Sequence, residues 1–435
     1  MLQNRSPAVV AASAVLLGLT SAASACDLCG VIDLPPRGGP AQYIAPQPAV
    51  TTEVPSWSSY ASAPASLYIK FDGVDFGDLS WGSSNQMPGV QPAFSRDADT
   101  STYSQTDLDA MHLIWSAVSE FYSPFNLNVT TVNPGNLNRR ENTQVVVSGN
   151  GSWYGNAGGV AYLGAFQSTS TPDLRIRTGW AFEDNYNDML GLAETVAHEA
   201  GHQFGLSHQS LFDQNGNRID TYRDTQDGGY TDPIMGGHYQ AVRSLWSDGT
   251  VGWNNGPIHQ DDMEKIASTQ GNPYGNYWNG FGLRADDWGN TPSEAGEMTI
   301  DDDVLRAAGV IEQVSDRDVF RFSSTGGIVN IYVDGAEFGQ MLDIRIDLYD
   351  AEEAHLLTAN PSLSLSPGAH DYGLDASFSG LLEAGDYFLA VGSNGAYGDV
   401  GQFFVTAWGA VAIPEPAAAG VLALAGLLLR RRSAA

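Results

Sequence analysis

Two patterns of hydrophobic residues along the first half of the chain predict a mixture of helices and strands. Apolar residues recur every three or four positions at Leu108, Met111, Trp115, Val118 and Tyr122, which predicts an amphipathic helix. Short runs rich in β-branched and aromatic residues surround this helix and predict strands. These runs are "SLYIKF" at 66–71, "FNLNVTTV", "TQVVVSG", "GGVAYLG" and "DLRIRTG". The first half of the chain is therefore expected to be α+β, with a mixed sheet.

A second helical pattern runs from about Asp188 to Phe204. At 100° per residue its apolar side chains gather on one side, whereas His198 and His202 fall on the other side. The apolar side consists of Met189, Leu192, Ala193, Val196, Ala200 and Phe204. The histidines therefore face away from the main apolar stripe, where a cleft is expected.

After the polar linker "DDWGNTPSEA" the pattern changes to a period of two residues, which is typical of half-buried strands. Turn signals separate the segments, so an all-β sandwich is expected. The segments are "DVFRFSS", "GIVNIYVDG", "LDIRIDLYD", "GDYFLAVG" and "GQFFVTAWG". A chain of 435 residues also exceeds what one hydrophobic core usually holds, so two domains are predicted.

Charge and cysteine content exclude some functions. Lys+Arg 20 against Asp+Glu 50 gives a net charge of -30, which repels phosphate backbones, so nucleic acid is not expected as a partner. The two cysteines, Cys26 and Cys29, both lie near the N-terminus and cannot hold the main domains together.

The N-terminus has the layout of a secretory signal peptide. Arg5 precedes the apolar stretch from Ala8 to Leu19, and Ala23-Ser24-Ala25 supplies a cleavage site. Residues 1–25 are therefore predicted to be removed by signal peptidase from an exported protein. Residues 26–64, rich in Pro, Ala, Ser and Gly, are expected to form a flexible leader or propeptide.

The C-terminal residues 411–435 combine a Pro414-Glu415-Pro416 triplet, a short apolar run and three arginines, Arg430 to Arg432. This end resembles the PEP-CTERM sorting signal of Gram-negative bacteria. The resemblance implies an exosortase-type partner and a location in the cell envelope or outside the cell. The short transmembrane segment is expected to hold the chain in the inner membrane only transiently, because the apolar run is short for an anchor.

The segment "HEAGHQFGLSH", residues 198–208, carries the candidate chemistry. His198 and His202, four residues apart on a helix, can bind one metal ion, and a bend at Gly205 can bring His208 to the same ion. Three imidazoles leave one coordination position for water, which indicates a catalytic Zn²⁺ site. Glu199 is expected to act as the general base in hydrolysis of a peptide bond.

The extended motif and a methionine that follows it resemble the metzincin metallopeptidases. The resemblance covers roughly residues 66–268, within a predicted domain at 65–283, and assigns Met235 of "TDPIMGGHY" to the methionine turn beneath the metal. It implies a zinc endopeptidase acting on proteins or peptides. It also implies that an edge strand at Gly159, Val160, Ala161 and Tyr162 pairs with the substrate backbone. A plain sheet strand remains the alternative for that segment.

Residues 286–408 resemble the pre-peptidase C-terminal (PPC) domain, a frequent appendage of secreted peptidases. The resemblance rests on segments such as "DVF" at 318–320 and "GDY" at 385–387. It implies a domain at 284–410 whose role is substrate binding, secretion or spacing.

Three further interpretations stay open at this point. The oxygen-bearing residues Asp213, Asn215, Asn217 and Asp220 could bind Ca²⁺, although a turn-rich surface loop is favoured because the closing glutamate of an EF-hand is missing. Cys26 and Cys29 could pair with each other, or one could inhibit the zinc site. The rival function is an envelope-displayed binding or adhesive protein with a vestigial zinc site.

Overall fold

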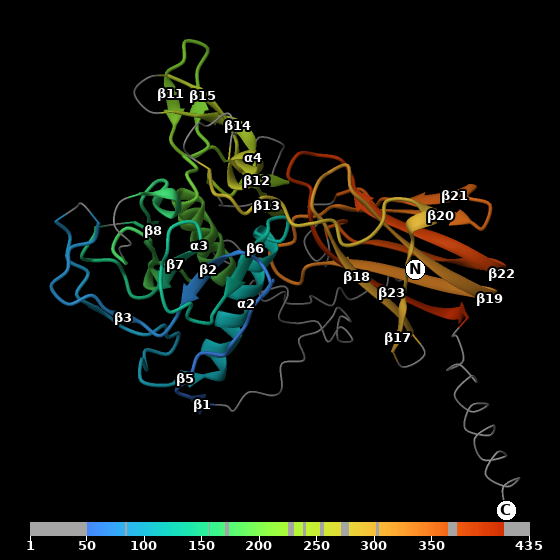
Figure 1. The fold of residues 1–435 in the computed structure, drawn as a ribbon, viewed down its shortest axis with the longest axis horizontal. Coiled ribbons are helices and arrows are strands. Elements are labelled where there is room, and N and C mark those ends of the chain that lie inside the picture. The colour runs from blue at the N-terminus through green and yellow to red at the C-terminus, as the bar shows by residue number, and fades with distance from the viewer. Residues whose placement is uncertain are drawn as a thin grey trace, which may run out of the picture.

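The computed structural model describes two modules that lie side by side (Figure 1). It describes residues 50–82, 85–155, 157–169, 174–224, 230–237, 241–252, 256–270, 278–301, 304–363 and 372–412. We call residues 50–283 the N-terminal module and residues 284–412 the β module. The predictions for the signal peptide, Cys26, Cys29 and the sorting signal after residue 412 lie outside the described residues.

The N-terminal module is built on a mixed five-stranded sheet in the order β6-β2-β7-β9-β8. The first four strands of this order are parallel, and β8 runs antiparallel at the edge. The strands are β2 (Ala65–Lys70), β6 (Leu127–Thr130), β7 (Asn142–Val147), β8 (Gly159–Val160) and β9 (Thr178–Ala181). The expected α+β class with a mixed sheet is confirmed.

Alternation along the strands divides the apolar residues between two faces of the sheet, as the pleat requires. Val145 and Val147 join the main core on one face, together with helices α2 (Gln105–Phe121) and α3 (Met189–Gln203). Val146 and Trp180 belong to a smaller cluster on the opposite face. The two helices contact each other, and α3 also packs on β7 and β9. This packing places α3 against the sheet, close to its antiparallel edge.

Short two-stranded ribbons and turns complete this module. They are β1 (Val50–Thr51) with β5 (Tyr103–Ser104), β3 (Val74–Asp75) with β4 (Val90–Gln91), β10 (Leu211–Phe212) with β11 (Arg218–Asp220), β12 (Thr231–Pro233) with β13 (Arg243–Leu245), and β14 (Asp248–Val251) with β15 (Ile258–Asp261). A short helix α4 (Asp262–Ile266) and the 3₁₀ turns η1 (Ala165–Gln167) and η2 (Glu183–Asn185) accompany them.

Two local expectations are corrected. Within "DLRIRTG", residues 174–177 form turns, and the strand begins only at Thr178; Arg177 is instead buried and donates hydrogen bonds to the carbonyls of Leu137 and Ser168. The described part of the expected flexible leader, residues 50–64, is packed on the module. Trp57 is buried in the main core, and its backbone N–H donates to Thr131. A large aromatic side chain thus anchors a segment whose composition predicts flexibility.

The β module is a single eight-stranded sheet folded into two layers, which confirms the all-β prediction. The long strands β19 and β22 pair along nearly their whole length and belong to both layers. Phe320 of one layer meets Phe403 of the other, with ring centroids 6.0 Å apart. The strands are β16 (Gly296–Glu297), β17 (Thr299–Asp301), β18 (Val304–Ile311), β19 (Arg317–Gly335), β20 (Ile344–Asp350), β21 (His355–Ala359), β22 (Ala376–Ser393) and β23 (Gly401–Val411), with the 3₁₀ turn η3 (Pro292–Glu294).

One further expectation changes here, because the predicted strands "DVFRFSS" and "GIVNIYVDG" are one strand. Gly326 and Gly327 have positive φ values of 87° and 142° and form an irregularity in the middle of β19. Glycine adopts this conformation without strain, so the strand bends from one layer to the other while it stays paired with β22.

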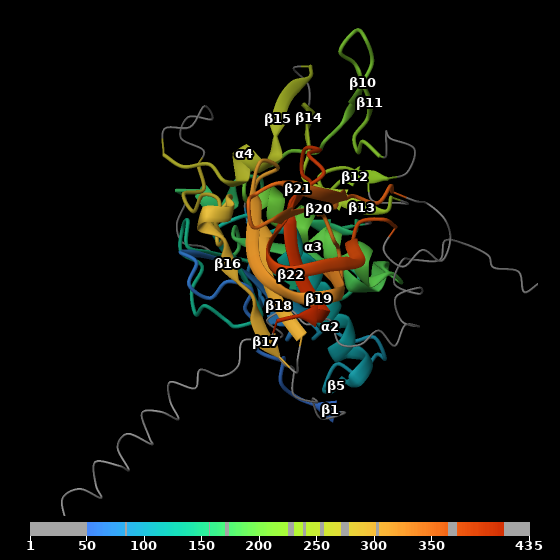
Figure 2. The ribbon, with the colours of Figure 1, turned by 90° about the vertical axis from the view of Figure 1, so that its right-hand side faces the viewer.

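Buried polar contacts join the two modules. Arg243 of β13 donates to Asp399 Oδ1 at 2.8 Å and to the Met341 carbonyl. Glu120 of α2 is fully buried and accepts from the backbone N–H groups of Met341 and Gln402. Figure 2, turned by 90°, shows the strands of the β module in front of α2 and α3. The modules are therefore fastened together rather than connected by the chain alone.

None of the helices in the described ranges combines the length and the apolar character required to cross a membrane.

Candidate metal centre and catalytic cleft

The end of helix α3 places the three histidines of the motif around one point. Asp188 caps the N-terminus of the helix, and Phe204 is the C-cap residue. Gly205, with φ of 100°, and Leu206 donate their N–H groups to the carbonyls of His202 and Gly201, which is a Schellman arrangement. The glycine reverses the chain and brings His208 back beside His202, as the sequence predicts.

The side chains of His198, His202 and His208 offer nitrogen atoms that all lie within 4.8 Å of one another. His202 Nε2 and His208 Nε2 are 3.0 Å apart. The Nδ1 atoms of His198 and His202 each lie 2.7 Å from a backbone carbonyl, of Ile234 and Leu206 respectively. A carbonyl can only accept, so both Nδ1 atoms carry the proton, and each Nε2 atom keeps the lone pair with which an imidazole binds a metal.

Burial keeps the imidazoles of His202 and His208 in the neutral form that binds metal. It lowers the pKa of His202 to about 4. Burial, and then the neighbouring His202 and Arg218, lower the pKa of His208 to about 3. Neutral imidazoles at neighbouring positions avoid the repulsion between charged rings, and three of them suit Zn²⁺.

Glu199 follows His198 on helix α3 and is only 5% exposed. Its Oε2 atom is buried and has no hydrogen-bond partner. Burial raises the pKa of this carboxyl well above its ordinary value. A buried carboxylate oxygen without a partner is costly in a folded protein. An ion and water held by the histidines would fit this orphaned atom.

Met235 packs beneath the histidines against a glycine of α3. It is fully buried, and a Cβ atom added at Gly201 would lie 2.6 Å from its sulfur. The preceding residue, Ile234, supplies the carbonyl that orients His198, and the Met235 carbonyl accepts from the N–H of Gln209. The methionine turn and the histidines therefore form one packed unit.

Residues 98–209, which contain α2, the sheet strands after it and all three histidines, match the sequence model of the reprolysin-like metallopeptidase family M12B. This segment is a reprolysin-like metallopeptidase domain. A comparison with curated proteins finds no significant match to the chain. Among solved structures, the chain resembles the pre-peptidase C-terminal domain of a collagenase from Bacillus anthracis, with 14% sequence identity and a TM-score of 0.20. That similarity covers 27% of this chain and 99% of the other.

The antiparallel edge of the five-stranded sheet lies beside Glu199. Strand β8 contains Gly159 and Val160 and pairs only with β9 within the described sheet. A Cβ atom at Gly159 would lie 2.7 Å from Glu199 Oε1, so the backbone of this strand touches the expected general base. Tyr162 turns away and packs on Trp81, with ring centroids 4.1 Å apart. Of the predicted substrate strand, Gly159 therefore lies beside Glu199, whereas Tyr162 packs on the small aromatic cluster.

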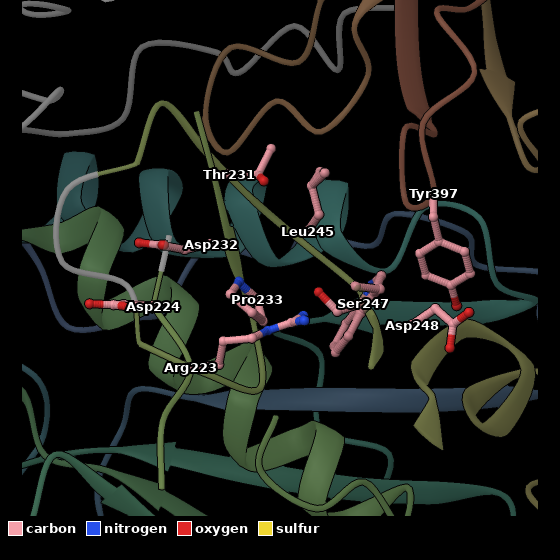
Figure 3. Close-up of a pocket in the computed structure, with 10 residues that line it drawn as sticks. Arg223, Asp224, Thr231, Asp232, Pro233, Leu245, Ser247, Asp248 and Tyr397 are labelled. Carbon is pink, nitrogen blue, oxygen red and sulfur yellow. The ribbon is translucent and has the colours of Figure 1, made fainter. Parts of the chain in front are cut away.

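Tyr222 and a neighbouring pocket flank the metallopeptidase site. The ring of Tyr222 lies 4.4 Å from that of His208 and 6.2 Å from that of His198, between centroids. Beyond it, a cavity of about 210 Å³ is lined by Arg223, by the strand β12 that leads to Met235, and by Tyr397 of the β module. Figure 3 shows Tyr397 closing the side of this cavity opposite Asp224 and Asp232. The second module therefore contributes to the surroundings of the methionine turn.

The loop at residues 213–220 is a hydrogen-bonded surface turn, and calcium binding there is not supported. Asp213 accepts from the N–H groups of Asn215 and Asn217 and from the Asn217 side chain, while Asp220 accepts from the N–H of Tyr222. Within the described residues two groups of side chains could share an ion, and this loop belongs to neither. The alternative of a turn-rich loop agrees with these contacts.

Sequence reasoning missed Gly201 and Tyr222. Gly201 could have been detected from the sequence. A glycine in the middle of a helix destabilises the helix by about 1 kcal/mol relative to alanine, which indicates that close packing requires a glycine there. The position of Tyr222 beside His208 has no comparable local signal, because it depends on how the chain between these two residues folds back.

Proposed function

We propose that this protein is an exported zinc-dependent endopeptidase. The observation that supports it best is the convergence of three imidazoles beside a buried glutamate oxygen that has no partner. The match of residues 98–209 to a metallopeptidase family supports the same proposal.

His198, His202 and His208 would hold the ion, and Met235 would support them from below. When bound, zinc supplies a Lewis acid that polarises the scissile carbonyl and activates water. Glu199 takes a proton from the attacking water and delivers it to the leaving amine. Burial raises the pKa of this carboxyl, which strengthens it as a base toward the attacking water.

The edge strand would orient the substrate. An extended peptide can add to β8 through backbone hydrogen bonds, which suits many sequences. Gly159 and Val160 would supply these bonds, and the contact between Gly159 and Glu199 would set the peptide next to the base.

The proposal keeps the predicted division of the chain. Residues 1–25 are a signal peptide for signal peptidase, 65–283 the peptidase domain, 284–410 a PPC-like domain and 411–435 a sorting signal for an exosortase-type enzyme. The contacts of Trp57 extend the folded part to residues that the sequence assigns to the leader. The proposed location is the cell envelope or the outside of a Gram-negative-type bacterium.

The test compares cleavage of casein and of a peptide library by the zinc-loaded protein, by the same protein treated with a chelator, and by Glu199→Gln. The matched control is Glu383→Gln, which changes an exposed glutamate of β22. We expect cleavage by the wild type and the control only, with zinc content equal in all the untreated proteins. Equal cleavage by Glu199→Gln would refute the role of Glu199, and a zinc-loaded wild type that cleaves nothing would favour the binding or adhesive alternative.

A further inference from the structure

Three exposed apolar side chains lie together on one face of the β module. Leu381 of β22 is 77% exposed, Ile328 of β19 is 61% exposed and Trp408 of β23 is 42% exposed. Ile328 is paired directly with Leu381, and Trp408 is paired with Asn330, two residues from Ile328. Side chains that are paired across strands, or that lie two apart along one strand, share a face of the sheet. We call Ile328, Leu381 and Trp408 the apolar patch.

The chain neighbours of the patch residues are buried, which directs the patch outward. Val329, Leu382 and Ala407 belong to the core of the β module, and successive side chains of a strand point to opposite faces. Strand β19 lies between β22 and β23 in the sheet, so the patch lies on the face of the sheet and not at an edge. Single exposed apolar residues are common on protein surfaces, whereas a group of them indicates an interaction surface.

The outward positions around the patch are uncharged. Ser379 donates to the side chain of Asn330 at 2.8 Å, so these two polar groups bind each other, and Glu383 of β22 borders the face. By alternation the outward positions are Ile328, Asn330 and Tyr332 of β19, Ser377, Ser379 and Leu381 of β22, and Thr406 and Trp408 of β23. The whole chain has a net charge of -30. An uncharged face in such an acidic protein can approach a surface that repels the rest of the chain.

The chain leaves the β module next to the patch. Strand β23 ends at Val411, three residues after Trp408, and the apolar run of the predicted sorting signal begins at Ala417. The stretch from residue 412 to residue 417 spans at most about 18 Å when it is fully extended. An apolar run inserted in a bilayer would therefore keep the patch close to the bilayer surface. Such a tether raises the effective concentration of the patch at that surface.

The patch lies away from the contacts between the two modules. The first residues of β23 contact α2, where the Gln402 side chain donates to Glu120. Trp408 lies six residues further along the strand, which is about 20 Å in extended conformation. Figure 1 shows β19 and β22 reaching the side of the β module that is remote from α2 and α3. Contact through the patch would therefore not involve the surfaces that join the modules.

We propose that the apolar patch docks onto the surface of a lipid bilayer, with Trp408 at the level of the headgroups and Ile328 and Leu381 inserted beside it. Tryptophan is enriched at membrane interfaces because its ring is apolar and its N–H is polar. The apolar run at 417–429 falls short of the about 20 residues of a spanning helix, so a second contact would strengthen the attachment. The proposal rests on the proposed sorting signal and is independent of the peptidase chemistry.

The test uses the full mature chain mixed with phosphatidylcholine vesicles, with and without lipids that are brominated in their acyl chains. Flotation with the vesicles measures insertion of the C-terminal apolar run. The fluorescence of Trp408 is the difference between the wild type and Trp408→Phe. Brominated lipid quenches this fluorescence where the ring lies in the bilayer interface, and iodide quenches it where the ring faces water. We expect quenching by brominated lipid and protection from iodide.

The double variant Ile328→Thr, Leu381→Thr should lower the quenching by brominated lipid about tenfold, because the two aliphatic side chains supply most of the apolar area that leaves water. Threonine keeps the preference for a strand, and both positions are exposed. Where the double variant fails to fold, Leu381→Thr alone should lower the quenching in the same direction. The matched control is Leu356→Thr, at a 45% exposed leucine of β21, which should leave the quenching unchanged.

Four results would overturn the proposal. Quenching of Trp408 by iodide alone would show that the patch faces water. Protection from both quenchers would show that the apolar run or a second copy of the chain covers the patch, and only a second copy would make the protection depend on the protein-to-lipid ratio. Unchanged quenching in the threonine variants would assign the contact to other residues. A chain that does not float would overturn the predicted membrane segment as well. None of these measurements involves substrate cleavage, so they can succeed or fail apart from the proposed peptidase activity.

Discussion

Replacing Gly201 with alanine tests the packing of the methionine turn against the metal-binding helix. In an ordinary helix this change stabilises the protein by about 1 kcal/mol. Here the new Cβ atom would lie 2.6 Å from the sulfur of Met235 and 3.4 Å from Leu206 Cδ1. Ordinary contacts between heavy atoms are about 3.5–4.0 Å, so the sulfur must move by roughly 1 Å in a fully buried site. Such overpacking costs about 1–3 kcal/mol, and the net effect should be destabilising.

The assay is urea unfolding of four proteins: wild type, Gly201→Ala, Met235→Ala and the double variant. Met235→Ala alone should lower the free energy of unfolding by about 2–5 kcal/mol. In that background the methyl group at position 201 meets no sulfur, so Gly201→Ala should become neutral or stabilising. The coupling energy should be about 2 kcal/mol. Zinc affinity should fall in Gly201→Ala, because Ile234, next to Met235, orients His198.

The result that would refute this reasoning is simple. If Gly201→Ala stabilises the wild type by the amount expected from helix propensity, and the two substitutions are additive, then Met235 does not press on the helix at this point. The account of the methionine turn as a support for the histidines would then lose its basis.

Three other substitutions give distinct outcomes. Gly159→Ala places a methyl group against Glu199 and should lower kcat about 100-fold while zinc content stays unchanged, as measured by steady-state cleavage and metal analysis. Arg243→Ala leaves Asp399 buried without its partner and should destabilise the protein by about 3–5 kcal/mol, with faster proteolysis at the junction of the modules. Glu194→Gln should remove a pH dependence of the stability. Burial raises the pKa of the Glu194 carboxyl from 4.5 to about 8, so the folded state binds the proton more tightly than the unfolded state. The stability of the wild type should therefore fall by a few kcal/mol relative to the variant as the pH rises through this range.

Each of these has a contrary result. Full activity in Gly159→Ala would place β8 away from Glu199, and Gly385→Ala, at a glycine of β22 with open space around it, is its control. Unchanged stability in Arg243→Ala would mean that the modules are not joined through this residue. Parallel curves of Tm against pH for Glu194→Gln and the wild type would show that residue 194 does not titrate on folding.

The sequence predicted the metal centre well because its geometry is mostly local. His198 and His202 lie one helical turn apart, and the bend at Gly205 is encoded by a residue that tolerates positive φ. Local patterns also predicted several strands of the core, such as β2 (Ala65–Lys70) at "SLYIKF". The prediction of a strand along the whole of "DLRIRTG" was wrong because Arg177 donates hydrogen bonds to the carbonyls of Leu137 and Ser168, which lie up to 40 residues away.

The contacts that the sequence could not reveal are those made across long distances in the chain. Glu120 meets Gln402 across 282 positions, and Arg243 meets Asp399 across 156. A glutamate in an amphipathic helix ordinarily faces water, and nothing near residue 120 indicates a buried partner.

The contacts of Arg243 and Glu120 between the two modules also determine where the end of the last strand lies. Strand β23 ends at Val411, and its first residues are hydrogen-bonded to the helix that packs on α3. The last strand is therefore connected, through α2, to the helix that carries His198 and His202. A tether at that end of the chain would also orient the three histidines.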